Sequence, residues 1–61
     1  MEPSVNAVIK WSVGRRERIL GYSSNRREII TIDIDDKKAL PMHGRTEEVE
    51  AAIQGGLGEV L

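Results

Sequence analysis

The sequence predicts an α+β domain: a three-stranded antiparallel β-meander followed by one C-terminal amphipathic helix, in the order β-β-β-α. Three observations support this prediction. Apolar and polar residues alternate in two segments, a helical apolar stripe occurs near the end, and turn-forming residues separate the segments. The 61 residues include no cysteine and no phenylalanine, so residues 1–61 are expected to form a single small domain with an aliphatic core.

The first strand is predicted over residues 5–13. Its odd-numbered positions are all apolar, namely Val5, Ala7, Ile9, Trp11 and Val13. The residues between them are polar except for Val8, and this two-residue period is typical of a strand that buries one face. Gly14 then permits a turn.

Two further strands complete the predicted meander. A short strand covers residues 17–23, with a bulge expected at Gly21 because a glycine inside a strand often marks one. The other strand runs through residues 30–35, where isoleucine alternates with polar residues. Its core-facing side chains are predicted to be Ile30, Ile32 and Ile34.

The only helix is predicted over residues 46–54. Thr46 is the predicted N-cap, and glutamates in the first turn suit the positive end of the helix dipole. The apolar stripe is formed by Val49, Ala52, Ile53 and Leu57. Gly55 and Gly56 are expected to end the helix, and residues 58–61 form either a frayed tail or a short strand that needs a partner.

The predicted core is too large for one short helix to cover. It consists of Val5, Ala7, Ile9, Trp11, Ile30, Ile32, Ile34, Val49 and Ile53. A helix of about nine residues is only ~14 Å long. Uncovered apolar surface and open strand edges are usually hidden by association, so the sequence predicts a homodimer or a complex with a protein partner.

No catalytic, metal or cofactor site is predicted. His43 is the only histidine and is expected in a loop, and the chain has no cysteine to form a reactive pair with it. Asp33 and Asp35 share a strand face that could meet Mg²⁺, but a solvated strand end explains both and no third ligand is evident. We therefore expect a non-enzymatic protein without a cofactor or a small-molecule substrate.

No membrane segment is predicted either. No run approaches the roughly 18 apolar residues of a membrane span. Residues 1–4 also lack the basic-then-apolar order of a signal peptide, so a cytoplasmic location is expected. The formal net charge of −1 argues against a general nucleic-acid coat protein.

The charges nevertheless separate along the chain and indicate two candidate binding surfaces. The first is acidic and would dock a basic protein partner; its residues are Glu47, Glu48, Glu50, Asp33 and Asp35. The second lies at the hairpin ends and would contact RNA or another anion through Arg15, Arg16, Arg18, Arg26 and Arg27.

The last third of the chain resembles a known family. Leu40-Pro41 is followed by the segment Gly44–Val49, which reads Gly-Arg-Thr-Glu-Glu-Val, and then by Ile53. This order resembles the HicB-type antitoxin family, in which an apolar-proline loop precedes Gly-x-Thr, an acidic helix start and an amphipathic helix. The resemblance implies a stand-alone β-β-β-α chain in a partial RNase H-like fold.

Two other resemblances involve earlier segments. Ile19-Leu20-Gly21 with the later Glu47-Glu48-Val49 is similar to the carbon storage regulator family of RNA-binding proteins. Ile9-Lys10-Trp11, residues 19–24 and Gly55-Gly56 are similar to the first half of OsmC-type peroxidases, although Leu57 stands where the reactive cysteine of that family would be.

The sequence therefore favours a small regulatory protein that binds a protein partner, antitoxin-like or inhibitor-like, as a dimer. The alternative is a dimeric RNA-binding post-transcriptional regulator that uses the arginine-rich hairpin ends. Only two aromatic residues are available for stacking on bases, and Trp11 belongs to the apolar register of its strand, which favours the first hypothesis.

Overall fold

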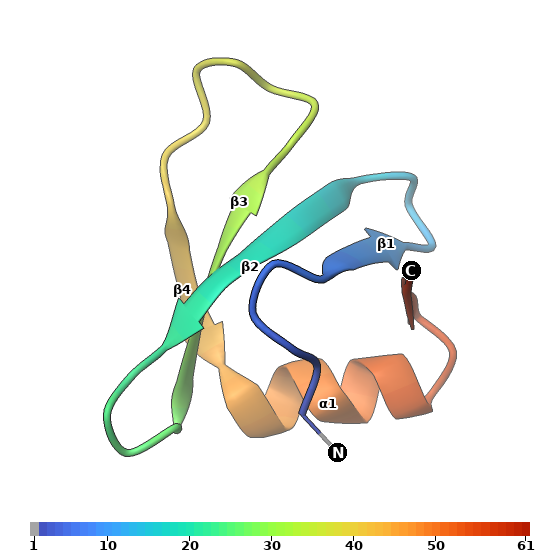
Figure 1. Cartoon of the computed structure of the whole chain (residues 1–61). Helices are drawn as coiled ribbons and strands as arrows, with labels where there is room; N and C mark the ends of the chain where they lie inside the picture. Colours follow the sequence, from blue (N-terminus) through green and yellow to red (C-terminus); the bar gives the residue numbers. More distant parts are fainter. Residues whose placement is uncertain (1) are drawn as a thin grey trace.

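Figure 1 shows a computed structural model of the chain, in which residues 2–61 are described and Met1 lies outside the description. These residues form one sheet of five strands and one helix. The elements in chain order are β1 (Val8–Trp11), β2 (Arg16–Tyr22), β3 (Glu28–Asp33), β4 (Met42–Arg45), α1 (Thr46–Gln54) and β5 (Gly58–Val60).

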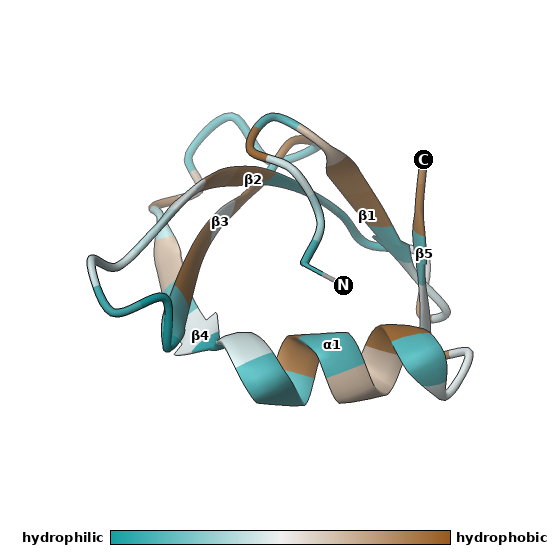
Figure 2. Ribbon diagram, turned by 60° about the horizontal axis from the view of Figure 1, so that its bottom comes forward, coloured by the Kyte–Doolittle hydropathy of each residue, from teal (hydrophilic) through white to brown (hydrophobic). Residues whose placement is uncertain are grey.

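The strands lie in the order β4-β3-β2-β1-β5, and each neighbouring pair is antiparallel. The last strand returns to the first, with Ile9 opposite Val60 and Trp11 opposite Gly58. The two edge strands are therefore joined in sequence by α1. Figure 2 shows the result: the sheet arches over the helix, with β4 at the start of α1 and β5 beyond its end.

The predicted three-stranded meander followed by a helix is wrong, because the fold is mostly β and has two more strands. The segment Met42-His43-Gly44-Arg45 has no apolar alternation, and it is a strand because β3 offers it an edge for pairing. His43 thus lies on β4 and not in a loop. Of the two possibilities left open for residues 58–61, the strand is realised, since β1 supplies the partner.

The core lies between the concave face of the sheet and α1. Its fully buried side chains come from the three central strands, and they are Ile9, Ile19 and Ile29. Partly buried side chains pack against them, namely Ala7, Trp11, Tyr22, Val49 and Ile53. Five of the nine residues predicted for the core are therefore at or next to it, while Ile19 and Ile29 were missed.

The predicted orientation of β3 is wrong. Ile29 and Thr31 are buried, so the alternate residues Ile30, Ile32 and Ile34 lie on the opposite, convex face of the sheet. Isoleucine occurs at both odd-numbered and even-numbered positions of this strand, so the alternation alone does not tell which set of positions is buried. Pairing with β2 decides it, because a shift of one residue exchanges the two faces.

The bulge expected in the second strand is confirmed next to Gly21. Ile19 pairs with Thr31 and Gly21 with Ile30, so Leu20 is the extra residue between two successive pairs. The first strand is shorter than predicted: residues 5 and 13 lie in the turns that flank β1, and Val5 and Val13 are 49% and 83% exposed.

The helix ends at Gln54 as predicted, but it begins one residue earlier, because its N-cap is Arg45 and not Thr46. Thr46 is the first helical residue and is buried, and its backbone N–H donates to the carbonyl of Arg27 in the β2–β3 turn. At the other end, the N–H groups of Gly56 and Leu57 donate to the carbonyls of Ile53 and Ala52. Gly56 adopts the left-handed φ of 85° that this Schellman-type ending requires.

The pairing of β5 with β1 depends on a glycine. A Cβ atom at Gly58 would lie 2.8 Å from Cε3 of Trp11 and 3.3 Å from Cγ2 of Ile9. Gly58→Ala should therefore displace the indole and lower the free energy of unfolding by about 1–3 kcal/mol. Urea unfolding followed by Trp11 fluorescence measures this change.

Gly21→Ala is the matched control, because no heavy atom lies within 4 Å of a Cβ at that position. Its stability should stay within about 0.5 kcal/mol of the parent. Equal destabilisation by the two substitutions would show that the close approach of Gly58 to Trp11 is not what matters.

Candidate functional site

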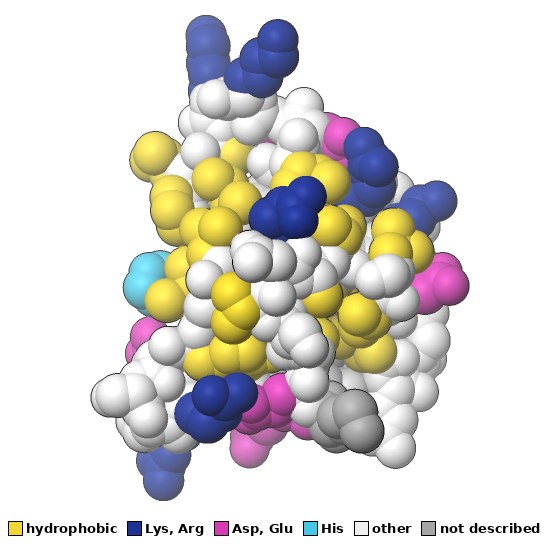
Figure 3. Space-filling view, viewed as in Figure 1, with side chains coloured by type: hydrophobic (Ala, Val, Ile, Leu, Met, Phe, Trp, Pro, Cys, Tyr) yellow, Lys and Arg dark blue, Asp and Glu magenta, His cyan; other side chains and the backbone are white. Residues whose placement is uncertain are grey.

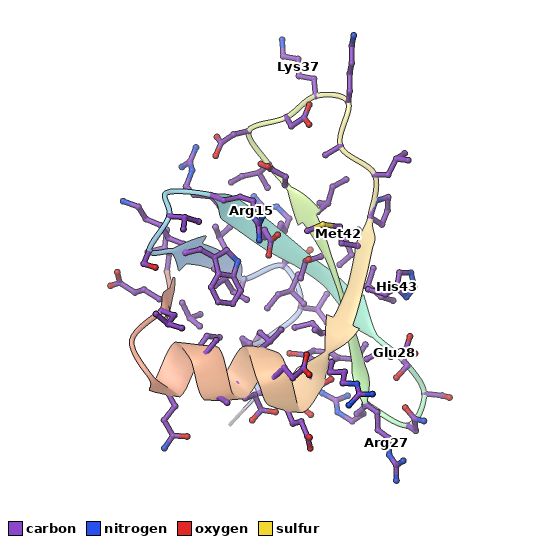
Figure 4. The ribbon with its side chains drawn as sticks, turned by 180° about the vertical axis from the view of Figure 1, so that it is seen from behind. Arg15, Arg27, Glu28, Lys37, Met42 and His43 are labelled. Atoms are coloured by element: carbon purple, nitrogen blue, oxygen red, sulfur yellow. The ribbon has the colours of Figure 1, made fainter. Side chains whose placement is uncertain are left out.

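The structure does not bring the five predicted arginines together. Arg15 and Arg16 lie at the end of the β1–β2 hairpin, and Arg18 lies on the convex face of β2. Arg26 and Arg27 belong to the β2–β3 turn, at the other end of β2. Figure 4 shows Arg27 at one extremity of the molecule and Lys37 at the opposite one.

At the β2–β3 end, Arg26 has a structural role. Its guanidinium donates to the carboxylate of Glu2 and lies 4.7 Å from the ring centroid of Tyr22. These hydrogen bonds raise the pKa of Arg26 above its ordinary value. Tyr22 in turn donates its hydroxyl proton to the carbonyl of Pro3 at 2.5 Å, so the pair holds the N-terminal segment against the sheet.

An open groove at this end is balanced in charge. It is lined by four glutamates, three arginines and Thr46: Glu2, Arg26, Arg27, Glu28, Arg45, Thr46, Glu47 and Glu50. An anion or a cation entering it would meet both signs of charge, so the groove favours neither.

The predicted acidic surface is not assembled. The three glutamates Glu47, Glu48 and Glu50 lie on α1, which begins where β4 ends. Asp33 is the last residue of β3 and Asp35 follows it, at the far end of the sheet. Asp33 accepts the backbone N–H of Asp35 at 2.9 Å, which fixes the turn between them.

Arg16 and Asp35 connect two neighbouring segments at that far end. Arg16 donates from Nε and from a terminal nitrogen to the two oxygens of Asp35, at 3.1 and 2.5 Å. The hydrogen bonds lower the pKa of Asp35 below its usual range. The pair therefore braces the β3–β4 connection against the β1–β2 hairpin.

The β3–β4 connection, residues 34–41, carries two lysines that belong to neither of the binding surfaces predicted from the sequence. We call it the lysine loop. It rises away from the helix in Figure 1, and Lys37 points away from the body of the protein in Figure 4. Asp36 shapes it, since its side chain accepts the N–H of Lys38 and its carbonyl accepts the N–H of Ala39. Lys37 and Lys38 are exposed on this loop, next to Asp35 and Asp36.

The convex side of the sheet mixes cations with exposed aliphatic side chains. We define the outward face as the residues of β1, β2 and β3, with the residue that follows β3, whose side chains point away from the helix. They are Val8, Lys10, Arg16, Arg18, Leu20, Glu28, Ile30, Ile32 and Ile34. In Figure 3, hydrophobic atoms cover the centre of this side, with Lys and Arg around and among them.

Arg18 holds a central position on the outward face. Its neighbours across the strands are Val8 on β1 and Ile32 on β3, and its guanidinium donates to the carbonyl of Asn6 at 2.9 Å. Lys10 lies opposite Arg16 on one side and Glu59 on the other. The same side also carries carboxylates: Glu28 begins β3, Glu59 lies opposite Lys10, and Asp35 is paired with Arg16.

A buried carboxylate supports the β1–β2 end from inside. Glu17 is 3% exposed, and its Oε1 accepts the indole N–H of Trp11 at 2.7 Å. Nε of Arg15 lies 3.0 Å from Oε2, close enough for an ion pair although it is off the line of a hydrogen bond. Glu17 therefore connects Trp11, which packs against the core, with the guanidinium of Arg15 at the β1–β2 turn.

Glu17→Ala should lower the free energy of unfolding by about 1–3 kcal/mol, because the indole N–H of Trp11 loses its acceptor. Glu17→Gln retains a carbonyl acceptor and should cost less. Urea unfolding of both variants measures the difference. If the glutamine variant is as unstable as the alanine variant, the ionic contact with Arg15 carries the effect and the hydrogen bond does not.

Two kinds of site are absent from residues 2–61. No group of three or more His, Asp or Glu side chains in this range is placed to hold a metal ion. No helix within the same range is long and apolar enough to cross a membrane.

Comparison with protein families shows the family to which the chain belongs. Residues 3–60 match the model of the TnsB N-terminal SH3-like domain, and the chain belongs to this family. The five-stranded sheet agrees with an SH3-like fold. No curated protein and no solved structure matches the chain.

This match corrects the resemblance to HicB-type antitoxins. It covers nearly the whole chain, whereas that resemblance rested on residues 40–53 alone. The proline loop and the acidic helix start are real, but they lead from β3 into β4 and α1 of an SH3-like sheet. The antitoxin and inhibitor interpretations are therefore withdrawn, and so are the two resemblances to other families.

Proposed function

We propose that this chain is a DNA-contacting module, of the kind that serves a TnsB transposase. The family assignment supports DNA as the ligand, because TnsB is a transposase. The observation that carries the proposal is the display of Lys37 and Lys38 on a braced, protruding loop, next to a convex face that bears Lys10 and Arg18. The acidic turn of α1 lies on the other side of the sheet.

The lysine loop carries two aspartates beside its two lysines, so the proposal rests on the protrusion of Lys37 and Lys38 and not on a net positive charge. One of these aspartates, Asp35, is already paired with Arg16. A duplex approaching the lysine loop meets Lys37 and Lys38 first, and their ammonium groups can replace counterions on the phosphates. A duplex approaching α1 meets glutamates and is repelled. The lysine loop is therefore the side on which phosphate contacts are expected.

Several expectations from the sequence stay predictions beside this proposal. They are the absence of enzymatic activity, the homodimer, a protein partner, RNA as a ligand and the cytoplasmic location. RNA would be attracted by the same cations, so an RNA duplex of equal length belongs in the binding experiment as a competitor.

Removal of the two loop lysines tests the proposal. Lys37→Ala/Lys38→Ala should weaken binding to a short DNA duplex by roughly tenfold or more at low salt, and should reduce the log–log salt slope by about 2. Fluorescence anisotropy with labelled duplex across a salt series measures both quantities. The fold should be unaffected, since the hydrogen bonds that shape the loop are made by its backbone and by aspartate side chains.

Arg27→Ala/Arg45→Ala is the matched control, because it removes the same charge near the β2–β3 end of the molecule. Its affinity and salt slope should stay close to those of the parent. Equal losses in the two double variants would contradict the assigned side, and an absence of binding by the parent at low salt would contradict DNA binding itself.

A further inference from the structure

We propose that the aspartates in and next to the lysine loop are positioning residues, which hold Lys37 and Lys38 in one fixed turn for contact with DNA phosphates. They are Asp33, Asp35 and Asp36. This inference rests on the proposed DNA-binding function and adds how the loop is prepared for its ligand. The observation behind it is that each of the three carboxylates accepts a hydrogen bond from the loop backbone or from the neighbouring hairpin.

The two lysines are the central residues of a β-turn. The backbone N–H of Ala39 donates to the carbonyl of Asp36 at 3.0 Å, which closes a turn of four residues around Lys37 and Lys38. Aspartate is favoured at the first position of such a turn, because its side chain accepts the N–H group two residues further on. Asp36 does this, since its Oδ1 accepts the N–H of Lys38 at 2.9 Å. One residue therefore fixes the backbone of both lysines, through its carbonyl and its side chain.

The segment that leads into this turn is fixed by two further aspartates. Oδ1 of Asp33 accepts the backbone N–H of Asp35 at 2.9 Å, just after the end of β3. The carboxylate of Asp35 then accepts two hydrogen bonds from Arg16, at 3.1 and 2.5 Å. Asp36 follows directly, so the turn that carries the lysines begins next to a residue that is attached to the β1–β2 hairpin.

These contacts explain why a loop proposed to meet DNA contains acidic residues. A carboxylate without a partner would repel phosphates and offset the attraction of the neighbouring lysines. The carboxylates of Asp35 and Asp36 instead accept hydrogen bonds from Arg16 and from the loop backbone. Lys37 and Lys38 are exposed, and no side chain among residues 2–61 engages their ammonium groups. The aspartates are therefore occupied within the loop, while the lysines remain available for a ligand.

A fixed turn lowers the cost of binding DNA. A mobile loop would lose conformational freedom when its lysines settle on phosphates, whereas an ordered turn has lost that freedom during folding. The number of phosphate contacts, and with it the dependence of affinity on salt, is the same in both cases. Loss of positioning should therefore lower the affinity without changing the salt slope, and this distinguishes it from loss of charge.

Two substitutions of Asp36 separate shape from charge. Asp36→Glu keeps the charge but moves the carboxylate one methylene further from the backbone, so the hydrogen bond to the N–H of Lys38 is lost. Its affinity for the short duplex should fall by about threefold or more at low salt, with an unchanged salt slope. Asp36→Asn removes the charge but keeps an oxygen acceptor in place, so it should bind at least as tightly as the parent. Fluorescence anisotropy across a salt series measures both variants.

The order of the turn is measured without DNA. Magnetic relaxation of the backbone amides of Lys37 and Lys38 should show added fast motion in Asp36→Glu and parent-like order in Asp36→Asn. Glu48→Asp is the matched control, because it also changes one exposed carboxylate by one methylene, but on α1. It should bind DNA like the parent. Urea unfolding establishes that each variant is folded under the binding conditions.

Arg16→Lys tests the attachment to the hairpin separately. It keeps the positive charge, but the ammonium group of lysine does not form the planar bidentate pair that Arg16 forms with Asp35. The affinity should again fall with an unchanged salt slope. The loss should be smaller than in Asp36→Glu, because both partners of the pair are about half exposed.

The contrary outcomes separate this inference from the proposed function. If the parent binds DNA and Asp36→Glu binds it equally well, the aspartates do not position the lysines, and the proposed function stands. The same holds if Asp36→Asn is weakened as much as Asp36→Glu, since the oxygen acceptor is then not what matters. If Asp36→Glu is unfolded, an unchanged affinity of Arg16→Lys overturns the inference instead. No DNA binding by the parent overturns both.

Discussion

The packing of three isoleucines under the arch of the sheet is the contact on which the rest of the structure depends. Ile9, Ile19 and Ile29 come from the three central strands and are the only fully buried large side chains among residues 2–61. They determine which face of each central strand is buried, and therefore which alternate residues point toward the solvent. Once Ile29 is inside, Ile30 and Ile32 must be outside.

A core this small makes the supporting contacts important. The helix alone does not cover the concave face of the sheet, and β5 must also pair with β1. Gly58 makes this pairing possible, because the indole of Trp11 occupies the space that a side chain at position 58 would need. The same indole donates to the buried Glu17, whose other oxygen faces Arg15. The pairing of β5 with β1 and the position of Arg15 at the β1–β2 turn thus both depend on the side chain of Trp11.

The distribution of charge follows from the same topology. Antiparallel hairpins place the β1–β2 turn and the lysine loop at one end of the sheet, where Arg16 and Asp35 join them. The β2–β3 turn falls at the other end, where Arg26 is engaged by Glu2 and Tyr22. The protruding lysines thus lie at the end of the sheet far from the acidic start of α1, with Asp35 and Asp36 beside them.

Local sequence patterns are enough to predict the elements with unambiguous signals: a helix that ends at Gln54, the bulge next to Gly21 and the presence of three central strands. It could not determine β4 or β5, because strands of three or four residues form only when a neighbouring edge supplies hydrogen bonds. It could not choose between the two isoleucine phases of β3, since both satisfy the alternation. Lys37 and Lys38 lie at the same end of the sheet as Arg16, and Arg26 lies at the other end. This arrangement depends on how the strands pair in space, which local sequence patterns do not specify.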